Sequence, residues 1–323
     1  HRYDDLRPAT TYAFGHAGGE IAVTTLSRPP GELLCRFATV NDVHFGEVEA
    51  GRLGKHQMGP IRRAEPGEAP YPETMNAGAV VEMTAIDPIA VFAKGDLTAD
   101  GTPDQFAAFE RVYRSAFGER LYAVRGNHDA YMFQTDYAGD RWVTVPGMAV
   151  ALLDTTTPGA TPGSIGAEQF EWLDTLAAES DVPVLVMGHH PQWLAHATEP
   201  HTRDGDTFSL DRPLSEALAE VCARRRSIVG YTAGHTHRHR NRPMLADGTM
   251  VTVEVGCVKD FPGTWAEYRV YEGGAMQVIH RISTADALSW SERCRHLYAD
   301  FGIDYETYAM GHLEDRCFLI PYR

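Results

Sequence analysis

Five short apolar segments constrain the fold most strongly, because each leads at once into glycine and polar residues of a metal-binding kind. The segments span residues 33–40, 89–93, 121–124, 184–187 and 228–231. They are followed by Asp42-Val43-His44, Gly95-Asp96, Gly126-Asn127-His128-Asp129, Gly188-His189-His190-Pro191 and Gly234-His235-Thr236-His237. Apolar runs of this length are typical of buried strands, and α/β sheets gather functional groups at the carboxyl ends of their strands. We therefore expect five loops to converge on one edge of an α/β core.

The polar residues at these strand ends form a ligand set without sulfur. The set comprises two carboxylates, one amide oxygen and four imidazoles, from Asp42, Asp96, Asn127, His44, His189, His235 and His237. Mixed nitrogen and oxygen ligands suit manganese, iron, zinc or cobalt, and they are a poor site for calcium or copper(I). Seven such residues are enough to bind two metal ions that share one carboxylate.

The five segments, in this order, resemble the calcineurin-like metallophosphoesterase superfamily. The family pattern reads Asp-x-His, Gly-Asp, Gly-Asn-His-Asp/Glu, a lone His, and Gly-His-x-His, and it spans about 200 residues here. The resemblance implies that Asp42, His44 and His237 bind one metal, that Asn127, His189 and His235 bind a second, and that Asp96 bridges them. It also implies a metal-dependent phosphoric ester hydrolase in which two cations (Mn, Fe or Zn) roughly 3.5–4 Å apart hold the attacking hydroxide.

His128 is expected to act in catalysis rather than as a ligand. In the family pattern the corresponding histidine faces the substrate, where it could protonate the leaving oxygen or stabilise the transition state. Asp129 is then expected to orient the His128 imidazole through its free nitrogen.

His190 and His239 also lie close to the predicted ligands in the sequence, so we consider whether they bind metal. Adjacent side chains in an extended segment point in opposite directions, so only one of His189 and His190 should reach a metal. We choose His189 because the family ligand stands two residues before a proline, here Pro191. His190 either faces the substrate or packs, and we interpret His239 as an exposed polar residue.

Departures from subfamily patterns narrow the substrate. Asp100 stands where the protein Ser/Thr phosphatases have a phosphate-binding arginine, and Ala99 stands where purple acid phosphatases have an iron-binding tyrosine. Gly126-Asn127-His128-Asp129 is most similar to bacterial class III cyclic-nucleotide phosphodiesterases and glycerophosphodiesterases. The resemblance thus implies hydrolysis of small phosphodiesters, with a phosphomonoesterase or a nuclease on the same metal site as the alternative. A catalytically inactive binding scaffold is disfavoured because every ligand residue is present.

Composition limits the partners. The formal charge of −15 argues against binding a nucleic-acid polymer and favours a small phosphoester substrate. Apolar stretches of about 18 residues are absent from the sequence, so we expect no membrane span. Five cysteines without a Cys-x-x-Cys pair favour a reducing, cytoplasmic location, with Cys294 and Cys317 as a conceivable disulfide. A homo-oligomer, and a signal peptide removed before His1, both remain open.

The pattern along the chain predicts a four-layer αββα sandwich of two mixed β-sheets flanked by helices. Residues 1–30 should form a strand pair packed on the core, with strands at 11–14 and 20–26 that extend one sheet. Residues 31–283 should form the catalytic domain, with helices at 72–86, 102–117, 167–178 and 213–225, the first helix preceded by a loop at 46–72 that could act as a substrate lid. Later strands are expected at 249–255, 265–271 and 275–282, followed by a C-terminal helical extension over 284–323.

Overall fold

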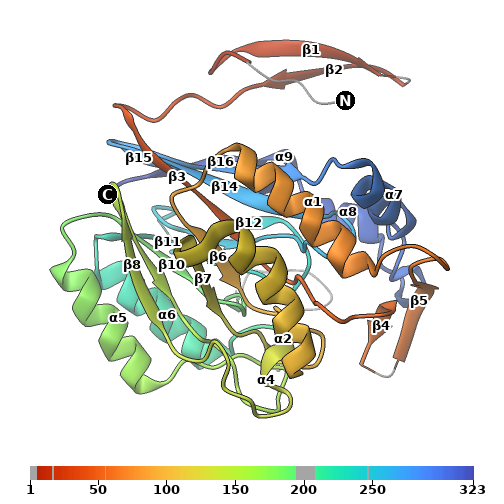
Figure 1. The fold of residues 1–323 in the computed structure, drawn as a ribbon. Helices are drawn as coiled ribbons and strands as arrows, with labels where there is room; N and C mark the ends of the chain where they lie inside the picture. The colour runs from red at the N-terminus through yellow and green to blue at the C-terminus, as the bar shows by residue number, and fades with distance from the viewer. Residues whose placement is uncertain (1–5, 17, 55, 194–207, 246) are drawn as a thin grey trace.

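Two six-stranded mixed sheets form the centre of the structure. The computed structural model describes residues 6–16, 18–54, 56–193, 208–245 and 247–323 (Figure 1). The strand order is β16-β15-β14-β3-β6-β7 in the first sheet and β12-β13-β11-β10-β9-β8 in the second. The first sheet contains β3 (Leu33–Val40), β6 (Val91–Lys94), β7 (Leu121–Val124), β14 (Thr264–Tyr271), β15 (Gly274–Arg281) and β16 (Phe318–Pro321). The second contains β8 (Arg141–Val145), β9 (Met148–Leu152), β10 (Val184–Met187), β11 (Ile228–Ala233), β12 (Arg240–Pro243) and β13 (Val251–Glu254).

Helices cover the outer face of each sheet. The longer helices are α1 (Tyr71–Ala85), α2 (Pro103–Phe109), α5 (Ala167–Glu179), α6 (Arg212–Arg224) and α7 (Ala285–Arg293). Shorter helices are α3 (Ser115–Phe117), α4 (Asn127–Ala130), α8 (Tyr305–Met310) and α9 (Leu313–Arg316). The expected helix over 102–117 is therefore interrupted by a π-helical turn at Glu110–Arg114, and the Thr102 side chain does not cap it.

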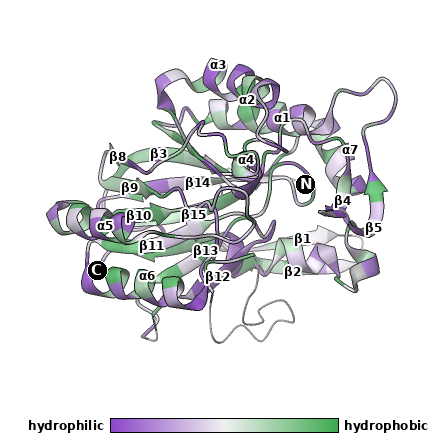
Figure 2. Ribbon diagram, turned by 90° about the horizontal axis from the view of Figure 1, so that it is seen from below, coloured by the Kyte–Doolittle hydropathy of each residue, from purple (hydrophilic) through white to green (hydrophobic). Residues whose placement is uncertain are grey.

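Three buried apolar layers confirm the four-layer sandwich. One layer joins the first sheet to α1, α2 and α7, the second lies between the two sheets, and the third joins the second sheet to α5 and α6. In Figure 2 central strands such as β10 and β11 are predominantly hydrophobic, the edge strand β12 is hydrophilic, and α5 and α6 mix hydrophobic and hydrophilic residues. This distribution follows from the sequence, because strands buried on both faces are apolar throughout while each helix buries only one side.

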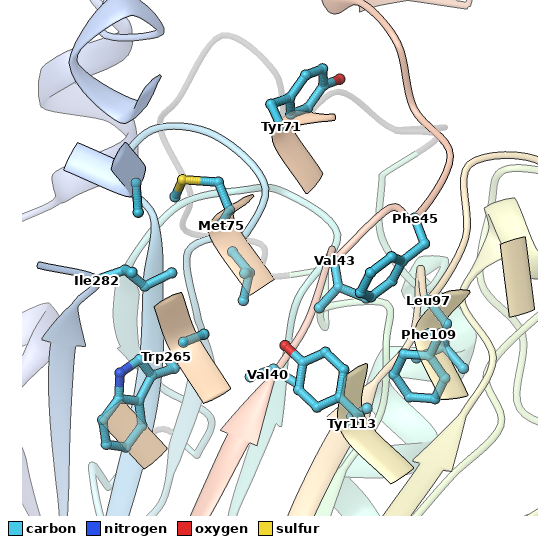
Figure 3. Close-up of a cluster of buried hydrophobic side chains, with 14 of the residues drawn as sticks. Val40, Val43, Phe45, Tyr71, Met75, Leu97, Phe109, Tyr113, Trp265 and Ile282 are labelled. Carbon is cyan, nitrogen blue, oxygen red and sulfur yellow. The ribbon is translucent and has the colours of Figure 1, made fainter. Parts of the chain in front are cut away.

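The first apolar layer reaches the end of β3. Figure 3 shows Val43 and Phe45, just beyond that strand, packed beside Phe109 and Tyr113. Asp42 and His44 flank Val43 and belong to a cluster of polar side chains instead of this core. Packing of Val43 and Phe45 therefore anchors the segment that carries these two polar side chains.

The N-terminal strand pair was predicted wrongly in one respect. β1 (Thr11–His16) and β2 (Gly19–Thr24) form an antiparallel pair, but they make a two-stranded sheet of their own instead of extending a large sheet. Figure 1 shows this hairpin above the two large sheets, and most of its described side chains are exposed. The prediction failed because periodicity identifies a hairpin without saying where it pairs.

The predicted long loop also contains structure. Strands β4 (Ala50–Leu53) and β5 (His56–Arg62) form a hairpin within residues 46–72. At Gly51 and Gly59 this hairpin packs closely against Leu297 and Ala299 of the C-terminal extension. The segment is therefore docked on the rest of the protein, and its role as a substrate lid stays a prediction.

The C-terminal extension is not purely helical. After α7, α8 and α9, its last strand β16 pairs with β15 at the edge of the first sheet. Trp290, Cys294 and Leu297 are buried in the same apolar layer as α1. All five cysteines are free, so Cys294 and Cys317 are not joined. None of the helices in the described part of the chain is long and apolar enough to cross a membrane.

The buried carboxylate of Glu267 in β14 gives a test of the fold. Arg269 and His280 lie 2.8 and 2.9 Å from it. Burial alone would raise the pKa of Glu267, but these hydrogen bonds lower it to about 2. A lowered carboxyl pKa stabilises the folded state above the unfolded pKa of about 4.3, and this contribution is lost as pH falls toward 2. Glu267→Gln should therefore lower the free energy of unfolding by about 1–3 kcal/mol at pH 7 and by roughly half as much at pH 3, where the folded carboxyl group is still largely ionised.

Urea unfolding at both pH values measures this difference. Glu292→Gln, which replaces an exposed carboxylate on α7, is the control and should change stability little at either pH. An equal loss for Glu267→Gln at pH 7 and pH 3 would mean that its charge is not the stabilising element.

Candidate metal centre

The five polar loops meet at one edge of the sandwich, as the sequence predicts. β3, β6 and β7 run parallel in the first sheet, and β10 and β11 run parallel in the second, so their carboxyl ends gather together. Backbone hydrogen bonds join the loops: the amides of Asp42 and His44 donate to the carbonyls of Gly95 and Asp96, and the amide of Gly234 donates to the carbonyl of His189.

The structure brings all seven predicted ligand residues together. One carboxylate oxygen of Asp96 lies 3.3 Å from His44 Nε2 and 3.3 Å from His189 Nε2. His189 Nε2 is also 3.1 Å from Asn127 Oδ1 and 3.2 Å from His235 Nδ1. Asp42 Oδ1 lies 3.4 Å from His237 Nε2. Ligand atoms of Asp42, Asp96 and His189 fall within 4.8 Å of one another, and so do those of Asp42, His44 and His237.

Five of these residues have an unusual backbone conformation. Asp42, His44, Asp96, His235 and His237 have φ values of 53°, 47°, 51°, 68° and 55°. Residues other than glycine adopt this left-handed region at a cost of about 1–3 kcal/mol each. The bonds between loops and the packing of Val43 and Phe45 hold these conformations.

Three potential ligand atoms in the cluster are buried without a hydrogen bond. Asp42 Oδ1, His44 Nε2 and His235 Nε2 are fully buried, and no other atom in the described part of the chain gives them a hydrogen bond. Buried polar atoms are normally satisfied, and leaving one unsatisfied is unfavourable by about 1–3 kcal/mol. A cation between these carboxylate and imidazole atoms would satisfy them, so the residues fit the ions that the resemblance implies.

Burial and charge act in opposite directions on the titratable groups. Burial would raise the pKa of Asp42 and Asp96, but neighbouring histidines lower both below the ordinary value. Burial lowers the pKa of His235 to about 3, which leaves its imidazole neutral. Burial also lowers the pKa of His189, but the Asp96 carboxylate outweighs it and raises that pKa to about 9. The carboxylates are therefore ionised at neutral pH, as metal ligands must be.

Two supporting residues were missed from the sequence. Lys94, at the end of β6, is fully buried and donates to Thr232 Oγ1 and the Ala233 carbonyl. Burial lowers its pKa to about 7, although Asp42 acts in the other direction. The Lys94 carbonyl accepts from His189 Nδ1, which aims Nε2 at the cluster. Asn41 donates to Asp42 Oδ2 and so leaves Oδ1 free. The sequence did contain a signal for Lys94, because a charged lysine within an apolar strand next to Gly95-Asp96 is unusual.

The geometry favours His189 over His190 as the ligand. Both ring nitrogens of His190 have protein partners, Thr155 Oγ1 at 2.9 Å and the Thr161 carbonyl at 3.0 Å. His190 therefore packs behind the site. His239 is buried, in contrast to our expectation. Its polar ring atoms are satisfied inside the protein, since Gly256 N–H donates to Nδ1 and Thr264 Oγ1 lies 3.2 Å from Nε2.

His128 lies beside the cluster with one ring nitrogen occupied. Its Nδ1 donates to the Ala99 carbonyl at 2.7 Å, and its ring is 4.6 Å from that of His44. The expected contact with Asp129 was wrong. Both Asp129 oxygens accept from the loop around Asp96, namely from the amides of Leu97 and Thr98 and from Thr98 Oγ1, and one of them also accepts from the Gly126 amide at the start of α4. Asp129 thus shapes the loop and does not orient the imidazole.

Tyr131, Phe133 and Arg125, which lie near this loop, differ in their contacts and exposure. The Tyr131 hydroxyl accepts from Asn127 Nδ2 at 2.6 Å, whereas Phe133 is largely exposed. Arg125 forms a buried ion pair with Asp154 at 2.7 Å and so does not face a substrate phosphate. Local sequence could not identify the partner of Arg125, because Asp154 lies 29 residues further along the chain.

The comparison with protein families agrees with this architecture. The calcineurin-like phosphoesterase family model matches residues 35–239, which is more than half of the chain. The chain therefore belongs to the calcineurin-like phosphoesterase family, whose members hydrolyse phosphoric esters. The match includes all seven predicted ligands and ends before the last strands of the first sheet.

Individual relatives are more distant. A probable cyclic nucleotide phosphodiesterase of Synechococcus sp. is 25% identical over 217 residues, which is 61% of this chain and 78% of that protein. A cAMP/cGMP dual specificity phosphodiesterase of Mycobacterium tuberculosis is 29% identical over 124 residues, 34% of this chain and 39% of that protein. A dimetal phosphatase from Danio rerio has the same fold, with a TM-score of 0.59 at 15% identity, covering 90% of this chain and all of that one.

Loss of the Asp129 carboxylate should unfold the loop around Asp96. Asp129→Ala leaves three buried amides without an acceptor, so we expect the free energy of unfolding to fall by about 2–4 kcal/mol. Asp136→Ala, at an exposed position of the following turn, is the control and should shift stability by less than about 0.5 kcal/mol. Urea unfolding of both variants measures the effect, and equal stability of the two would contradict the role given to Asp129.

Proposed function

We propose that this protein is a dinuclear-metal-dependent phosphodiesterase that hydrolyses small phosphodiesters, such as 3′,5′-cyclic nucleotides or glycerophosphodiesters. The observation that carries the proposal is the single contact network formed by Asp96, Asp42 and the four imidazoles, with buried ligand atoms that lack other partners. Asp42, His44 and His237 would hold one metal ion, and Asn127, His189 and His235 the other. Asp96, in contact with His44 and His189, would bridge them.

The protein side chains then have separate tasks. The bound metal ions supply Lewis acidity and lower the pKa of water, so that a nucleophile is available at neutral pH. Asp96 Oδ1 accepts from the His128 amide, which fixes the start of α4 against the metal ligands. His128 Nδ1 is held by the Ala99 carbonyl, so its imidazolium form presents Nε2–H for the leaving oxygen. No side chain is needed as a covalent nucleophile.

Two considerations favour small diesters as substrates. The relatives from Synechococcus sp. and Mycobacterium tuberculosis carry names that describe cyclic nucleotide hydrolysis. The formal charge of −15 disfavours an extended nucleic-acid substrate, because phosphate backbones bind to basic surfaces. A phosphomonoesterase or a nuclease on the same site is the alternative.

Replacement of His128 should separate catalysis from metal binding. His128→Ala removes the proton donor but leaves every proposed ligand, so kcat for a diester should fall about 100-fold to 10,000-fold. Metal content by elemental analysis should stay at the wild-type value. His56→Ala, on exposed β5, is the matched control and should keep full activity. Loss of metal from His128→Ala would contradict its assignment as a group that is not a ligand.

Metal removal and a substrate panel test the reaction class. Chelation should abolish hydrolysis of bis-p-nitrophenyl phosphate and of 3′,5′-cyclic AMP, and added Mn²⁺ should restore both activities. Under the proposal p-nitrophenyl phosphate and single-stranded DNA are poorer substrates, as judged by kcat/KM. Preference for the monoester or for DNA would select the alternative, and activity that survives chelation would reject a metal-dependent mechanism.

A further inference from the structure

A buried ionic cluster lies behind the proposed ligands of the first metal and is used by none of the steps above. Lys259 Nζ lies 2.6 Å from Glu47 Oε2 and 3.2 Å from Asp260 Oδ2, so one ammonium joins two carboxylates. Lys259 is 3% exposed and Asp260 is fully buried. The Glu47 side chain is 20% exposed, so two of the three charged groups are fully enclosed. Burying charged groups is unfavourable unless they are paired, as these groups are.

The two carboxylates of this cluster approach the two histidines of the first metal site. Glu47 Oε1 is 3.9 Å from His44 Nδ1, a buried atom that has no hydrogen-bond partner among the residues described. A ring nitrogen of His237, Cys257 Sγ and a carboxylate oxygen of Asp260 lie within 4.8 Å of one another. Metal-binding histidines commonly have a carboxylate behind the ring, which fixes its orientation.

The backbone of the same loop joins the β3 loop directly. The amides of Val258 and Lys259 donate to the carbonyls of Asn41 and Asp42. The cluster therefore contacts the Asp42-Val43-His44 segment through its backbone and through Glu47. It is placed to fix both the position of the segment and the direction of its imidazole.

The C-terminal extension holds this cluster from the outside. Trp290 Nε1 donates to the Lys259 carbonyl at 2.9 Å, and the Tyr305 hydroxyl donates to Asp260 Oδ1 at 3.1 Å. The Tyr71 hydroxyl donates to Glu47 Oε2 at 2.6 Å, and its ring stacks on Trp290 with centroids 4.1 Å apart. These contacts reach residues up to 305, whereas the family match ends at 239.

We propose that Glu47, Lys259 and Asp260 are positioning residues for the first metal site, and that the C-terminal extension sets the affinity of this site through Trp290 and Tyr305. The inference rests on the proposed function, because it requires Asp42, His44 and His237 to bind a metal ion. Lys259 pairs with both carboxylates and holds them beside His44 and His237.

A third metal site at His237, Cys257 and Asp260 is the competing interpretation of the same cluster. The ammonium group of Lys259 lies 3.2 Å from Asp260 and would repel a cation bound there. Cys257 Sγ also donates to Asp260 Oδ1, and burial raises the pKa of this thiol, which disfavours the thiolate that a metal needs. A supporting role for the cluster agrees better with these contacts.

Titration of metal-free protein with Mn²⁺, followed by calorimetry, tests the inference without an activity assay. Asn127→Ala should leave only the first site, and His44→Ala only the second. In the Asn127→Ala background, Lys259→Met should weaken Mn²⁺ binding by about 10-fold to 100-fold. In the His44→Ala background the same substitution should leave the dissociation constant unchanged. An unchanged constant in the Asn127→Ala background, or equal weakening in both, would overturn the inference.

Tyr305→Phe keeps the test valid if Lys259→Met does not fold, as judged by circular dichroism. It removes one hydroxyl and should weaken the first site by about threefold to tenfold, the value of one hydrogen bond. Glu306→Gln, at the adjacent half-buried position on α8 where the carboxylate pairs with Arg295 and not with the cluster, is its control and should have no effect. Equal binding by Tyr305→Phe and Glu306→Gln would overturn the role of the extension.

The stoichiometry of the wild-type protein distinguishes the two proposals. Two bound Mn²⁺ ions whose affinities do not respond to Lys259→Met would overturn this inference alone. Fewer than two ions in the wild type would instead reject the proposed dinuclear site. Three ions would replace the positioning role with the third metal site.

Discussion

Burial of two carboxylates at the edge where the sheets meet is the constraint on which the rest of this structure depends. Each carboxylate uses one oxygen to hold a loop from a distant strand: Asp96 Oδ1 accepts from the His128 amide, and Asp42 Oδ2 accepts from the His235 amide. The other oxygen of each faces imidazoles at 3.3–3.4 Å. Removing these charges from water is unfavourable by several kcal/mol, so the loops must supply donors in fixed positions.

The glycines of the motifs follow from the same crowding. A Cβ atom on Gly126 would collide with Asp96, and one on Gly95 would meet the His189 ring. Gly95 also has a φ of 88°, a conformation that favours glycine. The glycines before Asp96 and Asn127 are therefore needed for close approach of the loops. A larger residue at either position would force apart the segments that carry the predicted ligands.

The sequence predicted the strands, the ligand loops and their convergence, because each strand is a continuous apolar run that ends in glycine and polar residues. It failed where a residue's partner lies far along the chain. Asp129 was assigned to the neighbouring His128, whereas its oxygens accept from amides about 30 residues earlier. His239 was expected at the surface because nothing local announces its partners Gly256 and Thr264. Lys259 pairs with Glu47 across 212 positions, a separation that no local pattern encodes.

The two halves of the candidate centre are supported by different parts of the molecule. His189 and its neighbours rest on the second sheet and on Lys94, which lies between the sheets. The Asp42-Val43-His44 segment instead rests on α1, where Asn76 Nδ2 donates to the Val43 carbonyl and Tyr113 donates to Asn76. Because α1 also packs against α7 through Tyr71 and Trp290, the C-terminal extension contacts the same helix that supports the Asp42-Val43-His44 segment. The extension is thus linked by direct contacts to the part of the candidate centre that contains His44.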